Sequence, residues 1–145
     1  MATINPYLTF NGNCEDAFNF YKSVFETDFH FLEKFKNMPK SENPISENDL
    51  NKIMHVSLPI GGETILMGSD TIENGPKVNS GTNFSISINA KSKEEADKLF
   101  NGLSSEGNTI MPLSDTFWGA YFGMFVDKFG IQWMVNFDKQ QPTAN

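Results

Sequence analysis

The chain has 145 residues, of which 39% are apolar, and it carries a formal net charge of −7. This length predicts a single domain over residues 1–145, and the fourteen phenylalanines supply apolar surface for a sizeable core. The acidic balance and the absence of a Lys/Arg cluster exclude nucleic acid as an expected partner, because nucleic acid binding needs a basic footprint. No apolar run is long enough for a membrane span, the N-terminus lacks a signal-peptide core, and the single cysteine, Cys14, fits a reducing compartment, so we expect a cytoplasmic protein without a membrane partner.

The first part of the chain predicts a strand, a helix and three further strands. A strand over residues 4–10 precedes a helix for which Asn13 is the expected N-cap, because apolar residues recur at helical spacing after it. Further strands are expected at 28–35, 53–60 and 63–68. The polar stretch 36–51 contains two prolines and is interpreted as a surface loop that could act as a lid.

The same order of elements returns after a predicted linker at residues 69–82. A strand at 83–89 is followed by a helix that opens with the capping box Ser92 to Glu95. Strands are then expected near 109–113, 121–126 and 131–137. The chain therefore predicts two β-α-β-β-β modules, 1–74 and 80–138, inside one domain.

Aligning Gly62 with Gly130 without a gap places Leu66 on Met134 and Met67 on Val135. Alternation along the strands then predicts which side chains face the helices. We expect the helix-facing set to be Met54, Val56, Leu58, Phe84, Ile86 and Ile88. We expect the opposite faces to line a concave cleft, with His55, Ser57, Ser85 and Ser87 among the lining residues.

Three segments carry a family resemblance: YLTFNGNCEDAFNFYKSVF (7–25), MHVSLPIGGETILMGSD (54–70) and FWGAYFGMFVDKFGIQWMVN (117–136). They resemble the PhnB-like branch of the vicinal oxygen chelate superfamily, which includes glyoxalase I, extradiol dioxygenases and bleomycin- and fosfomycin-resistance proteins. The resemblance implies a glyoxalase-like α+β fold, in which two βαβββ modules form a curled mixed sheet with a concave cleft. It also implies a homodimer.

Enzymes of this superfamily hold a divalent metal with a His from the first strand and a Glu from the fourth strand of each module. The first-strand position falls on Asn5 or Pro6 in module one and on Ser85 or Phe84 in module two. The fourth-strand positions fall on Leu66 and on Met134. None of these is a histidine or a carboxylate, and both histidines of the chain, His30 and His55, lie in its first half. We therefore predict no metal site, no cofactor and no catalytic residue.

The predicted ligand-binding residues combine aromatic, thioether and small polar side chains, as small-molecule pockets do. His55 could instead be a structural histidine, and Trp118 could serve packing rather than a pocket. Tyr121 and Phe122 lie on opposite faces of one strand, so only one of them can reach the ligand. The predicted set is His55, Ser57, Met67, Ser85, Ser87, Trp118, Tyr121 and Met134.

Other candidate groups favour structural roles. We expect Trp133 to fill the core, Cys14 to be a buried thiol and His30 to be solvated. Asp70 and Asp127 are interpreted as turn residues.

The sequence thus predicts a metal-free protein that binds a small-molecule ligand, for which a cation would suit the acidic chain and its aromatic residues. The alternative is a divergent metal-dependent lyase or isomerase that uses His55 with Glu63 or Asp70. A third reading is a structural or regulatory dimer with a vestigial cleft. PhnB-like proteins are sometimes named ubiquinone-pathway methyltransferases, but the chain shows no Gly-rich cofactor turn on an α/β pattern.

Overall fold

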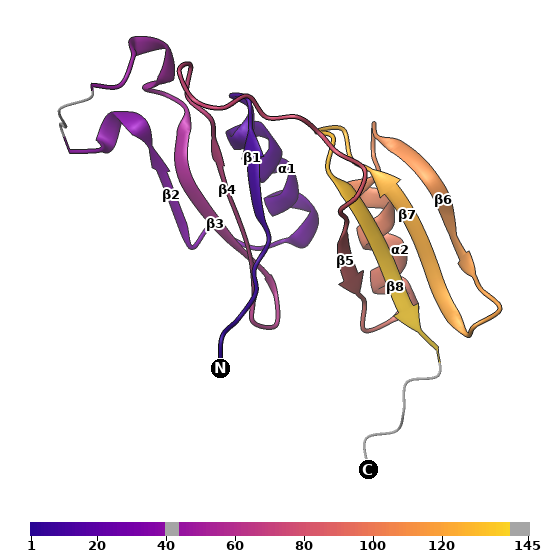
Figure 1. Ribbon diagram of the computed structural model, residues 1–145. Coiled ribbons are helices and arrows are strands. Elements are labelled where there is room, and N and C mark those ends of the chain that lie inside the picture. The colour runs from indigo at the N-terminus through magenta and orange to yellow at the C-terminus, as the bar shows by residue number, and fades with distance from the viewer. Residues whose placement is uncertain (40–43, 140–145) are drawn as a thin grey trace. The chain divides into compact units, whose positions relative to one another are not determined.

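The computed structural model describes residues 1–39 and 44–139, which form two compact units that divide between Asn79 and Ser80 (Figure 1). We refer to the described residues up to Asn79 as the N-unit and to those from Ser80 as the C-unit. The division falls inside the predicted linker 69–82. No helix in the described part of the chain is long and apolar enough to cross a membrane.

The N-unit is a four-stranded sheet with one helix on it (Figure 1). The strand order is β1-β4-β3-β2, with β1 parallel to β4 and the other neighbours antiparallel. Two short 3₁₀ turns, Phe35–Asn37 and Glu47–Asp49, lie between β2 and β3. The main elements are β1 (Tyr7–Phe10), α1 (Cys14–Phe25), β2 (Phe31–Lys34), β3 (Ile53–Gly61) and β4 (Thr64–Asp70).

The C-unit repeats this arrangement, with strand order β5-β8-β7-β6 and β5 parallel to β8. Because both units have the same element order and the same strand order, the predicted pair of βαβββ modules and the α+β class are confirmed. The shared cleft stays a prediction. The elements are β5 (Ile86–Asn89), α2 (Lys93–Leu103), β6 (Asn108–Asp115), β7 (Ala120–Val126) and β8 (Gln132–Asp138).

Each helix packs on one face of its own sheet through apolar side chains. In the N-unit, Phe18 and Tyr21 of α1 are fully buried, as are Val56 and Leu58 of β3. In the C-unit, Trp133 and Val135 of β8 are fully buried beneath α2, which confirms the core role predicted for Trp133.

A glycine in the helix-facing row of each sheet lets a helix phenylalanine approach the backbone. A Cβ built on Gly68 would lie 2.7 Å from Cε2 of Phe18, and one built on Gly123 would lie 2.6 Å from Cε2 of Phe100. Real Cβ atoms do not approach so closely, so both positions exclude any side chain as packed.

Two packing predictions need correction. Phe84 does not pack against a helix: it precedes β5 and is 67% exposed, because strand pairing with β8 begins only at Ile86. Met54 is half-buried rather than part of the closed core.

The gap-free alignment of the two modules is wrong by one residue. Met67 pairs with Tyr7 and Ser57, and the residue with the same sheet position in the C-unit is Met134, which pairs with Ser87 and Met124. Leu66, which the alignment placed on Met134, is fully buried on the helix side. The slip comes from the glycines chosen as the anchor: five residues separate Pro59 from Ile65 and five separate Val126 from Gln132, so the turns are equally long and Gly62 corresponds to Phe129 rather than to Gly130.

The two helices begin differently. Ser92 caps α2 as predicted, accepting a hydrogen bond from the Glu95 backbone N–H at 3.1 Å, while the Glu95 carboxylate accepts from Lys91 N–H at 3.3 Å. Asn13 occupies the N-cap of α1, but its side chain makes no capping bond. A carboxylate at the end of the neighbouring strand β4, Asp70, serves instead.

Candidate functional site

The face of the N-unit sheet opposite α1 carries one continuous row of side chains across all four strands. Strand register aligns Tyr7 of β1 with Met67 of β4, Met67 with Ser57 of β3, and Ser57 with Phe31 of β2. Tyr7 is 47% exposed and Phe31 is 45% exposed, whereas Ser57 between them is 6% exposed. We call the helix-free face of these four strands the N-face.

His55 lies between the two exposed aromatic rings of the N-face. Its ring centroid is 5.7 Å from that of Tyr7, with an interplanar angle of 29°, and 5.7 Å from that of Phe31, with an angle of 46°. The Tyr7 hydroxyl and His55 Nδ1 are 3.3 Å apart. The three rings therefore form an aromatic platform made from β1, β3 and β2, with a polar imidazole at its centre.

One carboxylate stands beside this platform. Glu33 of β2 is aligned with His55 of β3, while the preceding residue, Leu32, is aligned with the buried Val56. Alternation therefore puts Glu33 on the N-face. The next residue, Lys34, reaches the other side of the sheet, where its ammonium lies 3.5 Å from the Glu15 carboxylate of α1.

The helix-free face of the C-unit, the C-face, has a different composition. Register aligns Ser87 of β5 with Met134 of β8, Met134 with Met124 of β7, and Met124 with Met111 of β6. Three thioether side chains thus stand in neighbouring strands where the N-face carries Met67, Ser57 and Phe31. Ser85 precedes β5 and its hydroxyl accepts a hydrogen bond from the Gln132 amide at 2.6 Å.

Trp118 and Tyr121 lie in different surroundings. Trp118 lies in the turn between β6 and β7 and is 55% exposed. Its ring centroid is 5.0 Å from that of Phe117 and 6.2 Å from that of Phe122. Tyr121 points to the helix side, where its hydroxyl donates to the Asp97 carboxylate of α2 at 2.5 Å. This hydrogen bond, with burial and the nearby negative charge, raises the pKa of Tyr121 to about 12.

Placing Tyr121 on the ligand face was therefore wrong, and Phe122 is the residue of this pair that faces away from α2. The side on which Tyr121 lies could have been predicted from the sequence. Tyr121 has the same parity along β7 as Phe125, which is fully buried beside Phe100 of α2. Extending that parity by four residues assigns Tyr121 to the helix side.

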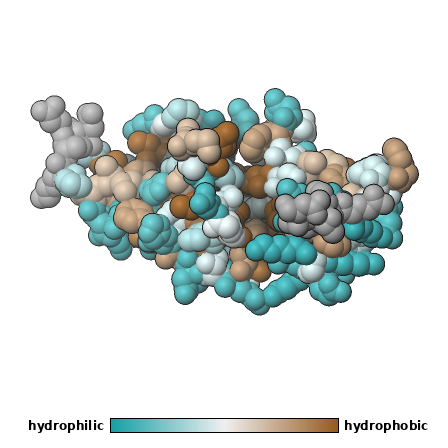
Figure 2. Space-filling view, turned by 90° about the horizontal axis from the view of Figure 1, so that it is seen from below, coloured by the Kyte–Doolittle hydropathy of each residue, from teal (hydrophilic) through white to brown (hydrophobic). Residues whose placement is uncertain are grey.

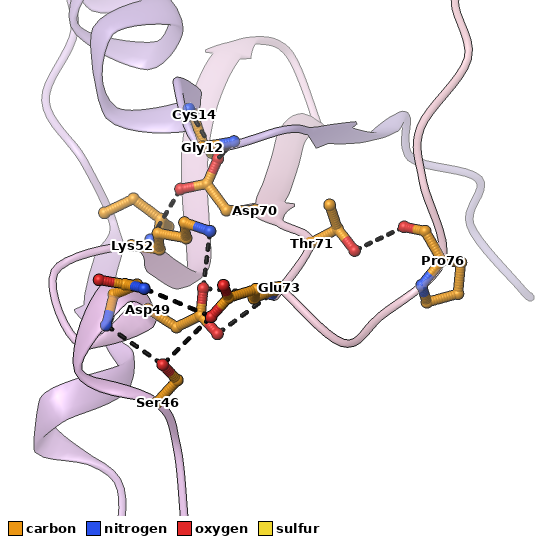
Figure 3. Close-up of polar contacts among 11 residues, drawn as sticks. Gly12, Cys14, Ser46, Asp49, Lys52, Asp70, Thr71, Glu73 and Pro76 are labelled. Carbon is orange, nitrogen blue, oxygen red and sulfur yellow. Dashed lines mark hydrogen bonds and ion pairs between the residues drawn. The ribbon is translucent and has the colours of Figure 1, made fainter.

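Asp70 is a structural carboxylate (Figure 3). It is 4% exposed, and its Oδ1 accepts hydrogen bonds from Gly12 N–H at 3.0 Å and Cys14 N–H at 2.9 Å, while Oδ2 accepts from Ile53 N–H at 2.9 Å. One side chain thus joins the start of α1, the start of β3 and the end of β4. This role is larger than the local turn that was predicted for it.

Asp127 serves the C-unit in a comparable way, within a shorter stretch of chain. Its Oδ1 accepts from Phe129 N–H at 2.8 Å and Ile131 N–H at 3.0 Å, which confirms its turn role, and its Oδ2 accepts from the Trp133 indole at 2.9 Å.

A second polar cluster fixes the end of the segment between β2 and β3 (Figure 3). Asp49 accepts from the Lys52 ammonium at 2.6 Å and from Glu73 N–H at 3.1 and 3.2 Å, and Ser46 donates to the Glu73 carboxylate at 3.2 Å. The Lys52 ammonium holds the pKa of Asp49 below its usual range. Residues 44–52 are therefore tied to the chain after β4. Residues 40–43 of the predicted lid lie outside the described residues.

The donor groups for a metal do not converge within residues 1–39 and 44–139, where no group of three or more His, Cys, Asp or Glu side chains could hold an ion. The superfamily's fourth-strand position in module one, corrected by the register, is Met67 rather than Leu66. His30 is exposed and Cys14 is fully buried, as predicted. Burial is the main cause that raises the pKa of the Cys14 thiol, followed by the Asp70 charge, so the sulfur stays protonated and unreactive.

Comparison with known proteins gives consistent matches over nearly the whole chain. A family model described as 3-demethylubiquinone-9 3-methyltransferase matches residues 2–136. Protein YjdN of Escherichia coli (strain K12) is 35% identical over 147 residues, covering 97% of this chain and 98% of YjdN.

Two solved structures share the fold. Protein PA1353 from Pseudomonas aeruginosa is 40% identical with a TM-score of 0.83, covering 95% of this chain and 98% of PA1353. A putative 3-demethylubiquinone-9 3-methyltransferase, PhnB protein, from Bacillus cereus is 24% identical with a TM-score of 0.73, covering 94% and 99% of the two chains. The second likeness, at this identity, concerns the fold alone.

Proposed function

Because this chain belongs to the PhnB-like branch of the vicinal oxygen chelate superfamily, we propose that it binds a small organic molecule on the helix-free sheet faces, without a resident metal. The observation that carries the proposal is the platform of Tyr7, His55 and Phe31. Two exposed rings flank a polar group that can accept or donate a hydrogen bond, which is the usual composition of a small-molecule site.

The side chains on the two faces support binding rather than metal chemistry. Imidazole nitrogens and carboxylate oxygens are the ligands that zinc and related ions use in such sites. The positions that would supply them carry Asn5 or Pro6, Ser85 or Phe84, and the thioethers of Met67 and Met134. This donor set does not fit the hard divalent ions of the superfamily.

The alternative lyase or isomerase would draw on His55 with Glu63 or Asp70. Both oxygens of Asp70 accept hydrogen bonds from buried backbone N–H groups, and withdrawing them would leave those donors unpaired. Glu63 is exposed in the turn between β3 and β4. No observation in the described structure favours this alternative over binding.

The family description names a methyltransferase, an activity that needs a site for a methyl donor. Gly-rich cofactor turns lie on parallel sheets between a strand and a helix. In each described sheet only one pair of neighbouring strands is parallel, β1 with β4 and β5 with β8. We therefore propose binding, and not methyl transfer, as the function.

A fragment screen tests the proposal. Small aromatic compounds would be titrated into untagged protein while backbone amide signals are followed by NMR, and each compound would be recovered and analysed by mass spectrometry. We expect saturable binding that shifts the amides around Tyr7, Phe31 and His55, with the compound recovered unchanged. Conversion of the compound, or near-stoichiometric zinc, nickel, manganese or iron in the untagged protein, would contradict the proposal.

We also propose that the protein is a homodimer in solution. Apolar side chains lie exposed among polar ones in the view of Figure 2, and in the C-unit Phe117 is 98% exposed, Trp118 55% and Ile110 51%. Such surface is commonly covered by a partner. Light scattering should give about twice the chain mass of 16.3 kDa, and a mass near 16.3 kDa at micromolar concentration would contradict dimerisation.

A further inference from the structure

We propose that the N-face selects a planar aromatic cation, which stacks on Tyr7, His55 and Phe31 with its positive charge beside the Glu33 carboxylate. The inference rests on the proposed ligand-binding function and adds the chemical class of the ligand. Three features carry it: the exposed rings, the position of Glu33 and the pattern of charge on the face.

The rings favour a flat ligand with a positive charge. Tyr7 and Phe31 keep about half of their surface exposed although they belong to the same register row as the buried Ser57. Aromatic faces carry a negative quadrupole, so they attract cations and stack with electron-poor rings. Both rings lie 5.7 Å from His55, so a flat ligand over the imidazole would lie beside both of them.

Glu33 supplies a full negative charge at the edge of this platform. Its Oε1 accepts from the Asn37 amide at 2.6 Å and from Lys34 N–H at 3.3 Å, and both donors are neutral groups. The nearest ammonium in sequence, that of Lys34, is used on the helix side by Glu15. The carboxylate is therefore positioned by hydrogen bonds without its charge being neutralised by them.

The charge pattern of the N-face disfavours an anionic ligand. The strand residues that alternation assigns to this face are uncharged apart from Glu33 and the titratable His55. The described strand lysine, Lys34, faces α1, and the whole chain has a net charge of −7. A phosphate, sulfonate or carboxylate ligand would find no partner of opposite charge among the described strand residues, whereas a cation would find Glu33.

Three probes of similar shape and different charge test the inference. N-methylquinolinium is cationic, quinoline is neutral and 1-naphthoate is anionic at neutral to weakly alkaline pH. Their affinities for the full chain would be measured by NMR titration, which also reports where each probe binds. We expect N-methylquinolinium to bind on the order of tenfold more tightly than quinoline and to shift the N-face amides, with 1-naphthoate weakest.

Glu33→Gln separates the carboxylate from the platform, because glutamine retains an oxygen that can accept from Asn37. It should lower the affinity for N-methylquinolinium by about three- to tenfold and leave that for quinoline unchanged. The matched control is Glu63→Gln, which makes the same change of net charge in the exposed β3–β4 turn and should affect neither probe.

The outcomes distinguish this inference from the proposed function. If quinoline or 1-naphthoate binds the N-face as tightly as N-methylquinolinium, or if Glu33→Gln and Glu63→Gln behave alike, the selection for cations is overturned while the proposed function stands. If no probe of any charge, and no compound of the fragment screen, shifts the N-face amides, both are overturned.

Discussion

In the N-unit and in the C-unit, a single helix covers a sheet of the same strand order, and a glycine in the helix-facing row admits a phenylalanine from that helix. The faces turned away from the helices differ. The N-face carries Tyr7, Phe31 and His55, whereas the C-face carries methionines at 111, 124 and 134. Packing against a helix constrains both sheets alike, and the opposite faces are where the two units differ in chemistry.

The thioethers of the C-face and the rings of the N-face suit different contacts. Methionine is flexible and polarisable and adapts to varied apolar partners, whereas tyrosine and phenylalanine present rigid surfaces with a defined electrostatic pattern. We therefore expect selectivity to reside on the N-face, and three predictions compare the units in order of decreasing effect.

The largest expected effect concerns the carboxylates at the ends of β4 and β8. Asp70→Ala should destabilise the fold by about 3–5 kcal/mol, because three backbone N–H groups lose a charged acceptor in a buried place. Asp138 ends the corresponding strand of the C-unit but is exposed, so Asp138→Ala should cost less than about 1 kcal/mol. Urea denaturation of the two variants measures the free energy of unfolding. Equal losses in the two variants would mean that the Asp70 carboxylate does not hold α1, β3 and β4 together.

The glycines of the helix-facing rows should respond alike. Gly68→Ala and Gly123→Ala should each destabilise the fold by about 1–3 kcal/mol, since the new methyl group would overlap Phe18 and the Leu8 carbonyl oxygen, or Phe100 and the Leu113 backbone. The double variants are Gly68→Ala/Phe18→Leu and Gly123→Ala/Phe100→Leu. A stability loss smaller than the sum of the two single losses would confirm the contact with the phenylalanine. A strictly additive result would show that the overlap with the Leu8 or Leu113 backbone, which the leucine leaves in place, sets the cost.

A smaller difference is expected in the response to pH. Lys52 lowers the pKa of Asp49, and Lys139 lowers that of Asp115 in the C-unit. A carboxylate with a lowered folded-state pKa stabilises the fold above its ordinary pKa of about 4, and this stability is lost as the pH falls through the folded-state value. The pKa of Lys52 is raised by the same pair. The stability that Lys52 contributes is therefore present at every pH below its ordinary pKa, and it is lost as the pH rises through the raised pKa.

The side chain of Asp49 is 3% exposed and that of Asp115 is 59% exposed, so solvent screens the second pair more strongly. The free energy of unfolding of wild type, Asp49→Asn and Asp115→Asn would be measured by denaturation from about pH 7 down to about pH 2. We expect it to fall less steeply with decreasing pH for Asp49→Asn than for the other two proteins. If Asp115→Asn changed the pH dependence of stability as much as Asp49→Asn or more, the contacts of Asp49 would not be what holds residues 44–52 to the end of β4.

The sequence predicted the fold well because apolar alternation and capping residues are local signals. They placed His55, Ser57 and Met67 on one face of the N-unit, and Met134 on the corresponding face of the C-unit. The wrong predictions concern side chains whose orientation or role is set by a partner far away in the sequence. Tyr121 turns to α2 because Asp97 accepts its hydroxyl, and Asp70 caps a helix that begins 56 residues earlier in the chain.

The one-residue error in aligning the modules comes from anchoring on two glycines that are not equivalent. The two turns have the same length, but Gly130 stands one position later in its turn than Gly62 does, so the alignment placed the helix-side Leu66 on Met134 of the C-face. Glu33, by contrast, could have been found: it lies two residues from Phe31 in a predicted strand, with the same parity.

Strand β3 has a binding face and a packing face, and His55 and Val56 test this division as neighbours of opposite parity. His55→Ala should leave thermal stability nearly unchanged and weaken binding of N-methylquinolinium by roughly 1–3 kcal/mol. Val56→Ala, which removes methyl groups from a fully buried site, should cost about 1–3 kcal/mol of stability and leave affinity unchanged in the folded protein. Thermal melts and titrations in which His55→Ala costs as much stability as Val56→Ala, with affinity intact, would contradict the claim and make His55 a structural histidine.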